Sequence, residues 1–464
     1  MPAGTGKTEM VAELVKHFSE EGMHSLVLTH THAGVDALRR RMKALEVPKG
    51  AATIRTIDAW CLDLIGHFPE ISGIKPAEEP DWRLVEQYYQ SGSLVVAAPA
   101  IIRMLRASYD LFVVDEYQDC QIWQHEFIER VSRVVATCVF GDRMQGLFFF
   151  GRQQPVVWES EVEATFPAVG LEPIPWRWRN KNEALGEWLL DARLKLLRNE
   201  PIDLVGSPIR VCDPGEITRV LSHLPPPPST TIAISQFPTS AAALASRLGG
   251  SYTMIEEIEG KHLLAFAEAV DNGDSSIIAY QVVEYAVSCA FGVADEIDKK
   301  SRRRLYAGKP LTKRQTSTNE NAVAAVAGVN ELLNNTEMRT IRSALLAISR
   351  LEKFRLYRRE AWYGILDALR LCETSEGLTL REAVVRTRNK IRETGRHPEA
   401  RTIGRLLLVK GLEFDNAVLD APVDISKPYN SHELYVGLTR GSASVTVMSA
   451  SSRLAPRRPT RVPE

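Results

Sequence analysis

The chain has 464 residues, and its 57 lysines and arginines nearly balance its 58 aspartates and glutamates, giving a formal net charge of -1. Hydrophobic residues at 44% and charged residues at 25% are typical of globular proteins, which excludes a chain that is disordered throughout. The balanced charge also excludes a strongly basic nucleic-acid-binding chain, so any DNA contact must come from local patches or from base stacking.

Membrane and disulfide signals are absent from the sequence. No apolar run approaches the ~18 residues of a membrane-spanning helix, and no secretory signal opens the chain, so we expect no membrane partner. The six cysteines form no C-x-x-C pair, which favours free thiols over a zinc or iron–sulfur site. Free thiols are typical of the reducing cytosol, and the sequence therefore predicts a cytoplasmic protein.

Strand-like and helix-like segments alternate along the first half of the chain. Strands are predicted at 25–29, 52–56, 111–114 and 136–140, and helices at 9–19, 35–45 and 123–131. A second region of this kind has predicted strands at 209–212, 231–235, 417–419 and 444–448, and it is interrupted by helical spacing at about 261–397. The alternation predicts an α/β chain with parallel sheets and helices on both faces.

The segment Ala3-Gly4-Thr5-Gly6-Lys7-Thr8 runs directly into a helix-like stretch. Small residues let backbone N–H groups turn inward around phosphates, and the helix N-terminus adds its dipole. In such a loop, Lys7 would reach the β- and γ-phosphates and Thr8 would hold Mg²⁺. A glycine-rich turn that only caps a helix is the alternative.

Two further strand ends support the phosphate-binding interpretation. The apolar run 111–114 leads into Asp115 and Glu116, which places two carboxylates at the edge where α/β sheets bind ligands. Asp115 would complete the Mg²⁺ site, and Glu116 would orient or deprotonate the attacking water. The next strand delivers Gln145, whose amide can contact a γ-phosphate. Either strand end alone could be a helix cap, but the three elements in this order favour an ATP site.

These residues resemble the UvrD/Rep-type DNA helicases of superfamily 1A, in a compact form of the kind found in phage-defence or mobile-element systems. The string Asp115-Glu116-Tyr117-Gln118-Asp119 is similar to the D-E-x-Q-D form of motif II. Segments 410–415 and 435–440 closely match motifs V and VI. Segments similar to motifs Ia, Ib, III and IV lie at 28–31, 56–60, 141–145 and 176–180.

The resemblance implies ATP and Mg²⁺ as cofactors and gives roles to further residues. Gln145 and Arg440 would contact the γ-phosphate, and Trp178 would stack on the adenine. Two tryptophan–arginine pairs follow one another in this segment. Either Arg177 or Arg179 would therefore be the second arginine at the γ-phosphate.

Other motifs of the family imply contacts with nucleotide and DNA. Glu413 of motif V would belong to the nucleotide site. The residues implied to contact DNA are Thr29, His30, Thr56, Trp60, Phe148, Phe150 and Lys410.

The resemblance also implies two RecA-like lobes, each interrupted by a helical insert. The implied parts are lobe 1A at 1–66 and 108–170, a small 1B-like insert at 67–107, lobe 2A at 171–260 and 398–452, a helical 2B-like insert at 261–397, and a disordered tail at 453–464. ATP would lie between the lobes, and closure would bring the arginines to the γ-phosphate.

Three departures from the family pattern qualify these expectations. Met1 stands in the first position of the P-loop, and the strand that should precede the loop is missing. We expect translation to start upstream; the alternative is a protein that lacks this central strand, which would compromise phosphate binding. Arg405 and Leu407 replace the usual T-x-H ahead of motif V, and the 1B-like insert is short. Strand separation is therefore less firmly predicted than movement along a strand.

The resulting prediction is an ATP-dependent 3′→5′ translocase or helicase on single-stranded DNA, with a tailed duplex as a further substrate. We expect a monomer or a weak oligomer. Two alternatives stay open: an ATP-gated sensor that switches a partner nuclease or another protein, and a pseudo-helicase that binds DNA without hydrolysing ATP.

Overall fold

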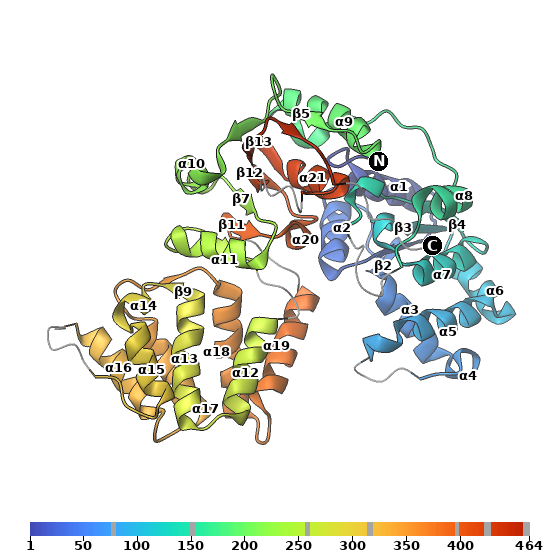
Figure 1. The fold of residues 1–464 in the computed structure, drawn as a ribbon. Coiled ribbons are helices and arrows are strands. Elements are labelled where there is room, and N and C mark those ends of the chain that lie inside the picture. The colour runs from blue at the N-terminus through green and yellow to red at the C-terminus, as the bar shows by residue number, and fades with distance from the viewer. Residues whose placement is uncertain are drawn as a thin grey trace. The chain divides into compact units, whose positions relative to one another are not determined.

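The computed structural model of the protein describes residues 1–75, 80–147, 154–255, 260–312, 319–394, 399–421 and 428–457. The chain divides into two compact units. Unit 1 comprises Met1–Pro208, Ser426–Ala443 and Arg453–Glu464, and unit 2 comprises Ile209–Ile425 and Ser444–Ser452. Each unit contains a parallel sheet with helices packed on it, which confirms the predicted α/β fold class (Figure 1).

Unit 1 is built on a parallel sheet with the strand order β2-β1-β3-β4. Its strands are β1 (Ser25–Thr29), β2 (Ala52–Thr56), β3 (Leu111–Val114) and β4 (Ala136–Val139). Every residue of β1 and β3 is buried, as central strands of a parallel sheet require. The register aligns Thr29 with Thr56 and Val114 with Val139, so the carboxyl ends of the strands share one edge.

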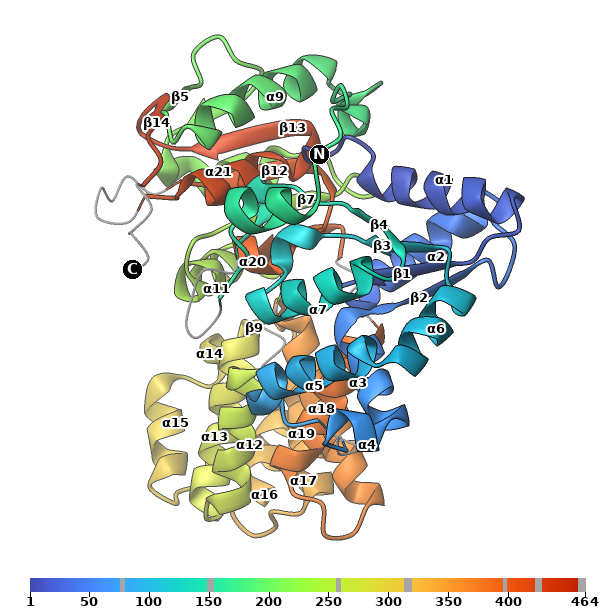
Figure 2. The same cartoon turned by 90° about the vertical axis from the view of Figure 1, so that its right-hand side faces the viewer.

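Helices cover both faces of this sheet. On one face, α1 (Lys7–Glu20) and α2 (His32–Ala44) pack on the strands through a core that includes Val11 and Val113. The other face carries α3 (Ile57–His67), α5 (Val85–Ala97), α6 (Pro99–Ser108) and α7 (Ile122–Ser132), and Figure 2 shows α3, α5 and α7 grouped on this side. The short α4 (Pro69–Ser72) follows α3.

The segment expected to form a separate 1B-like insert belongs to this second core. Tyr89 and Val95 of α5 and Ile101 of α6 are buried in the same cluster as Phe112 of β3. These side chains pack on the sheet, so α5 and α6 share the core of unit 1.

Unit 1 also contains elements that follow its sheet in the chain, two of them close to the C-terminus. They are α8 (Glu163–Thr165), α9 (Glu183–Leu197), α21 (Ser431–Leu438) and the antiparallel strands β5 (Ile202–Asp203) and β14 (Arg453–Leu454). Asn182 caps α9 and donates to the carbonyl of Ala443 at 2.9 Å, and Lys181 donates to Ser442 at 3.1 Å. The unit boundary after Pro208 therefore differs from the lobe boundary expected at residue 171.

The pairing of β14 with β5 contradicts the assignment of Arg453 and Leu454 to a disordered tail. Leu454 is buried in this pairing, which gives the strand an apolar anchor. Residues 458–464 of the expected tail lie outside the described part of the chain.

Unit 2 contains a six-stranded sheet with the order β6-β13-β12-β7-β11-β8. The strands are β6 (Arg210–Cys212), β7 (Thr231–Ile234), β8 (Thr253–Met254), β11 (Arg401–Gly404), β12 (Phe414–Asp420) and β13 (Gly441–Met448), and the helices beside them are α10 (Ile217–His223), α11 (Pro238–Arg247) and α20 (Leu406–Val409). Strand β7 pairs in parallel with both β11 and β12. Neither β8 nor β11 was predicted from the sequence.

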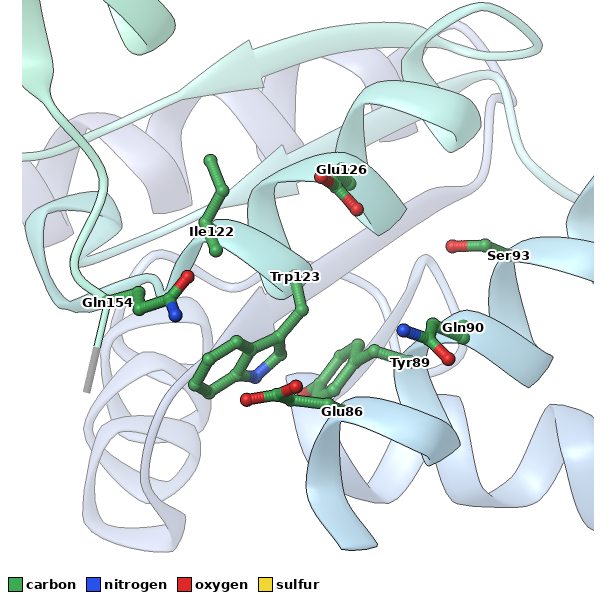
Figure 3. A pocket seen from close by; sticks show the side chains of 8 residues that line it. All are labelled: Glu86, Tyr89, Gln90, Ser93, Ile122, Trp123, Glu126 and Gln154. Atoms are coloured by element: carbon green, nitrogen blue, oxygen red, sulfur yellow. The ribbon is translucent and has the colours of Figure 1, made fainter. Parts of the chain in front are cut away.

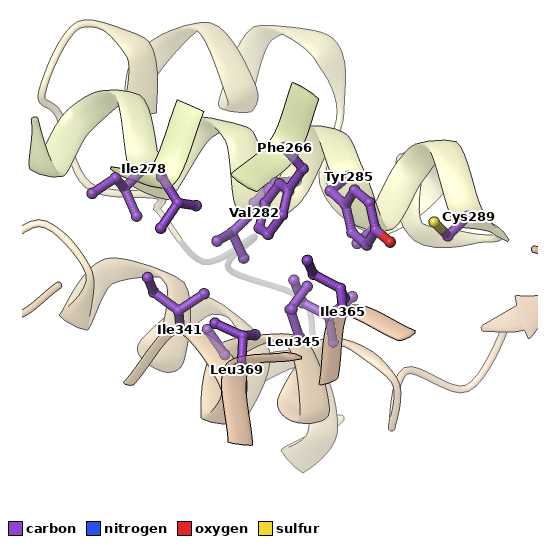
Figure 4. Packing of buried hydrophobic residues seen from close by; sticks show 14 of the residues in the cluster. Phe266, Ile278, Val282, Tyr285, Cys289, Ile341, Leu345, Ile365 and Leu369 are labelled. Atoms are coloured by element: carbon purple, nitrogen blue, oxygen red, sulfur yellow. The ribbon is translucent and has the colours of Figure 1, made fainter. Parts of the chain in front are cut away.

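The helical character predicted for about 261–397 is confirmed. The helices are α12 (Lys261–Asn272), α13 (Ser275–Cys289), α14 (Val293–Glu296), α15 (Lys299–Tyr306), α16 (Glu320–Glu331), α17 (Met338–Ile348), α18 (Arg359–Thr374) and α19 (Leu380–Thr394). They share one apolar core (Figure 4). On α17, Ile341, Leu345 and Ile348 recur at helical spacing and are fully buried. Strands β9 (Ala290–Phe291) and β10 (Arg355–Leu356) form an unpredicted antiparallel pair within this segment.

Two further facts concern the whole described chain. No helix in the described ranges is long and apolar enough to cross a lipid bilayer. All six cysteines are free thiols.

His262 is a half-buried histidine of α12 whose ring packs against α13. His262 forms a hydrogen bond through Nε2 with the Ser288 hydroxyl at 2.7 Å, and its ring stacks on Tyr285 at a centroid distance of 4.9 Å. Burial, with a smaller contribution from the charge of Arg358, lowers the pKa of His262 from 6.5 to about 4. The imidazole is therefore neutral in the folded protein at neutral pH.

This lowered pKa predicts an acid-sensitive contribution to stability. Between pH 6.5 and 4 the unfolded chain binds a proton at His262 that the folded chain does not, so the free energy of unfolding falls as the pH falls. Relative to His262→Phe, the wild type should lose about 2 kcal/mol between pH 7.5 and pH 5.0, as measured by denaturant unfolding. An equal pH dependence in the two proteins would contradict a neutral, buried imidazole.

Candidate active site

The loop that precedes α1 turns at two glycines. Gly4 has φ 68° and Gly6 has φ 85°, both in the left-handed region that favours glycine. Gly6 is the N-cap of α1, which runs for 14 residues, and the Thr5 hydroxyl donates to the carbonyl of Pro2 at 2.8 Å. A glycine-rich turn at the N-terminus of a helix presents backbone N–H groups and a positive dipole, which together suit a phosphate.

Lys7 is the first residue of α1 and is buried. Its Nζ donates to the carbonyl of Met1 at 3.1 Å and to the carbonyl of Pro2 at 3.0 Å. Burial lowers the pKa of Lys7, and the negative charges of Asp142 and Glu116 oppose this effect. The ammonium group is thus placed among carboxylates at the edge of the sheet.

Asp115 and Glu116 directly follow β3, as predicted. Burial and then repulsion from Glu116 raise the pKa of Asp115 to about 7. Glu116 adopts φ 57°, and its backbone N–H donates to Oδ1 of Asp115 at 2.9 Å. A buried carboxylate with a raised pKa is one whose charged form a nearby cation would stabilise.

The residues predicted to hold Mg²⁺ have suitable chemistry for that ion. Thr8 lies in the first turn of α1, and Asp115 lies at the carboxyl edge of β3. A hydroxyl and a carboxylate oxygen match the preference of Mg²⁺, which also uses nucleotide phosphates and water as ligands. The unfavourable burial of the Asp115 charge is the structural observation that fits a cation there.

Gln118 connects Glu116 to the end of the neighbouring strand β4. Its Nε2 donates to Oε2 of Glu116, and its Oε1 accepts from the backbone N–H of Asp142 at 2.8 Å. A Cβ at Gly141 would lie 2.9 Å from this same oxygen, so the contact requires glycine. Gln118 is the glutamine of the D-E-x-Q-D string, but no role was predicted for it from the sequence.

The predicted γ-phosphate residues Gln145 and Arg440 lie together within unit 1. Oε1 of the buried Gln145 accepts from Nη2 of Arg440 at 3.4 Å. Arg440 follows α21 and is fully buried, and its Nε donates to the carbonyl of Val436 at 2.9 Å. The two residues are 295 positions apart in the sequence, and the family resemblance had placed both at the γ-phosphate.

The segment 176–178 forms one turn of 3₁₀ helix that packs against the phosphate loop. The backbone N–H of Arg177 donates to the carbonyl of Gly4 at 3.1 Å. Trp178 is only 1% exposed, its indole N–H donates to the carbonyl of Gly441 at 2.8 Å, and a Cβ at Gly4 would lie 2.5 Å from its ring. Trp178 is therefore a packing residue in this structure, which conflicts with its predicted role as the adenine platform.

Trp176 is the exposed tryptophan of the pair, with 48% of its surface accessible. Its ring is the nearest side chain to the Cβ position of Gly6, at 3.4 Å, and the Arg179 guanidinium lies 4.5 Å from the ring centroid. Arg177 instead directs Nη1 at the carbonyl of Thr439, at 2.8 Å. The available tryptophan–arginine pair is thus Trp176 with Arg179.

Trp60, predicted to contact DNA, belongs to the core of unit 1. It is buried, and its ring lies 5.5 Å from Phe127 and 6.2 Å from Phe112 between centroids. Burying this large aromatic ring in the core stabilises the fold. Burial therefore conflicts with a direct role for Trp60 in base contact.

Other predicted DNA contacts lie at the carboxyl edge of the sheet. Thr29 and Thr56 are buried, and the Thr56 hydroxyl caps α3 by accepting from the backbone N–H of Ala59 at 3.1 Å. His30 is half-buried, with Nε2 3.5 Å from the Cys120 sulfur. The local geometry gives Thr56 a structural role.

The remaining predicted residues lie elsewhere in the chain. Phe148 and Phe150 lie outside the described residues. Lys410 follows α20 and is half-buried, whereas Glu413 precedes β12 and is exposed. Both belong to unit 2.

A separate pocket of about 140 Å³ opens between α5 and α7 (Figure 3). It is lined by Glu86, Tyr89, Gln90, Ser93, Ile122, Trp123, Glu126 and Gln154. None of the residues predicted to bind ATP or Mg²⁺ lines it. The candidate active site is therefore defined by the convergence of strand ends and the phosphate loop, and not by this pocket.

Comparison with known protein families gives a match to the part of the chain that contains these residues. A model of the AAA domain family matches residues 1–151, which span the phosphate loop, the carboxylates after β3 and Gln145. This part of the chain is accordingly similar to that family of AAA domains. No curated protein matches the chain.

The Gly4 contact gives a prediction with a matched control. In Gly4→Ala, the left-handed φ and the clash with Trp178 should together cost about 2–4 kcal/mol of unfolding free energy and weaken nucleotide binding. Gly22→Ala has a similar φ of 77° but no atom within 4 Å of the new Cβ, so it should cost only about 1 kcal/mol. Denaturant unfolding and calorimetric titration with ATP measure the two effects, and equal losses would contradict the close contact.

Proposed function

We propose that the protein is an ATP-dependent translocase on single-stranded DNA that hydrolyses ATP at the phosphate loop of unit 1 and moves 3′→5′. One observation carries the proposal. Lys7, the carboxylates after β3 and the Gln145–Arg440 pair converge within one compact unit, although they lie far apart in the sequence. The direction of movement follows from the resemblance to UvrD/Rep-type helicases.

The site supplies the groups that ATP hydrolysis needs. Lys7 would exchange the carbonyls of Met1 and Pro2 for phosphate oxygens, a charge-assisted and therefore stronger contact. Thr8 and Asp115 would hold Mg²⁺, which neutralises charge on the phosphates.

Glu116 is the group suited to activate water. Its carboxylate is held by the Gln118 amide, so its orientation is set before a nucleotide arrives. A positioned carboxylate can accept the proton of the attacking water as the bond to the γ-phosphate forms. Gln145 and Arg440 can donate hydrogen bonds to the oxygens on which negative charge accumulates.

We assign stacking on the adenine base of ATP to Trp176. Its exposed ring lies beside the phosphate loop, and Arg179 lies over the ring. An aromatic ring stacks on a purine without reading its hydrogen-bonding pattern, which suits a nucleotide platform.

Replacing this platform should weaken ATP binding selectively. Trp176→Ala should raise the KM for ATP about tenfold, which corresponds to ~1.4 kcal/mol of stacking, and change kcat little. Trp82→Ala removes another tryptophan of unit 1 that is 49% exposed and should leave KM unchanged. An unchanged KM for ATP in Trp176→Ala would show that another residue stacks on the adenine.

Steady-state ATP turnover with and without single-stranded DNA tests the enzyme. Turnover by the wild type should rise with DNA, Lys7→Ala should lose ATP binding, and Glu116→Gln should bind ATP but lose about 10²–10⁴-fold in kcat. A wild type that binds DNA without turnover would contradict the proposal and support a pseudo-helicase.

Directional movement is tested separately with tailed duplexes. A 3′-tailed duplex should be unwound, or a protein bound on its tail displaced, whereas a 5′-tailed duplex should not respond. ATP turnover without movement on either substrate would contradict translocation and support an ATP-gated switch acting on a partner nuclease.

A further inference from the structure

Asp142 is a buried charge at the centre of a hydrogen-bond network in unit 1. Its side chain is 0% exposed. Oδ1 accepts from Nη2 of Arg193 at 2.8 Å and from the backbone N–H of Met144 at 3.2 Å, and Oδ2 accepts from Nε2 of Gln145 at 3.2 Å. The carboxylate thereby holds the amide whose oxygen faces Arg440.

Arg193 comes from α9 and belongs to none of the motifs found in the sequence. Its side chain is 15% exposed, and its guanidinium lies 5.9 Å from the ring centroid of Tyr435 on α21. The Tyr435 hydroxyl accepts from the backbone N–H of Ala3 at 2.8 Å. Arg193 therefore lies where α9, α21, the end of β4 and the phosphate loop meet.

The charge balance explains why an arginine is needed here. Burial alone would raise the pKa of Asp142, but the positive charges of Arg193 and Lys7 reverse this effect and lower it. Lys7 is also the residue that would bind the nucleotide phosphates. Once its charge is engaged there, Arg193 is the cation bonded to Asp142 that keeps this carboxylate ionised and in place.

We propose that Arg193 is a positioning residue for ATP hydrolysis, which holds Asp142 and through it directs the Gln145 amide toward Arg440 and the γ-phosphate. The inference rests on the proposed ATPase function. Arg193 itself touches neither the nucleotide nor the water, so its effect is on the geometry of the groups that do. Such an effect lowers kcat more than it changes the KM for ATP.

Steady-state kinetics of the full-length chain test this role. Arg193→Met should lower kcat about 10- to 100-fold, with the KM for ATP within about threefold of the wild type. Arg193→Lys, which keeps a charge but loses the planar fork, should recover part of kcat. The control is Arg302→Met, because Arg302 is 12% exposed and bonds Glu284 at 2.8 Å in unit 2, and its loss should leave kcat unchanged.

A double variant separates positioning from stability. Arg193→Met leaves a buried carboxylate without its arginine and should lower Tm. Adding Asp142→Asn removes that charge and should restore Tm, yet kcat should stay low because Gln145 no longer has a fixed, charged acceptor.

Three outcomes would overturn the inference. They are recovery of kcat together with Tm in the double variant, a kcat for Arg193→Met no lower than that of Arg302→Met, and a loss confined to KM. Failure of the proposed function is distinct from these, because it would appear as absent ATP turnover in the wild type, and that result would overturn both proposals.

Discussion

The contact between Gly4 and the indole of Trp178 is the constraint on which the arrangement of the active site depends. No side chain larger than hydrogen fits at Gly4, because a Cβ would lie 2.5 Å from the indole. The adjacent backbone bond from Arg177 to the Gly4 carbonyl holds the tryptophan turn against the loop. Through the bond from Trp178 to Gly441, the same contact sets the segment that directly follows Arg440. The phosphate loop and the arginine are thus placed by one tightly packed junction.

The two buried cations of this site, Arg440 and Lys7, form hydrogen bonds with neutral acceptors inside the protein. Arg440 bonds an amide oxygen and a backbone carbonyl, and Lys7 bonds two backbone carbonyls. All these acceptors are neutral, whereas phosphate oxygens are charged and form stronger hydrogen bonds with the same donors. Under the proposed function, phosphate oxygens would replace these neutral acceptors with charged ones. The Asp142 carboxylate, by contrast, accepts a hydrogen bond from a different arginine, Arg193, and we expect it to keep this partner when a nucleotide binds.

The sheet of unit 1 and most of its strand-end residues could be predicted from the sequence, because short buried apolar runs such as 111–114 have few other interpretations. Strand β11 could not be predicted, because its four residues include Arg401 and Gly404 and form no apolar run. Its burial results from pairing with β7 and β8 on either side. The same limit applies to the tryptophan turn. An aromatic residue beside an arginine is compatible with either a ligand platform or a core residue, and only packing separates Trp176 from Trp178. Arg193 belongs to none of the recognised motifs, and no pattern in the sequence indicated its partner 51 positions earlier.

The two tryptophans of the 3₁₀ turn also differ in their optical environment. An indole in water emits at longer wavelengths than one enclosed by protein, and here the two environments occur two positions apart on a single rigid turn. Trp176 faces solvent beside the phosphate loop, and Trp178 is enclosed with its N–H bonded to a carbonyl. The turn therefore contains a solvent-sensitive indole beside an enclosed one. Binding at the phosphate loop should alter the emission of Trp176, superimposed on that of the other seven tryptophans of the chain.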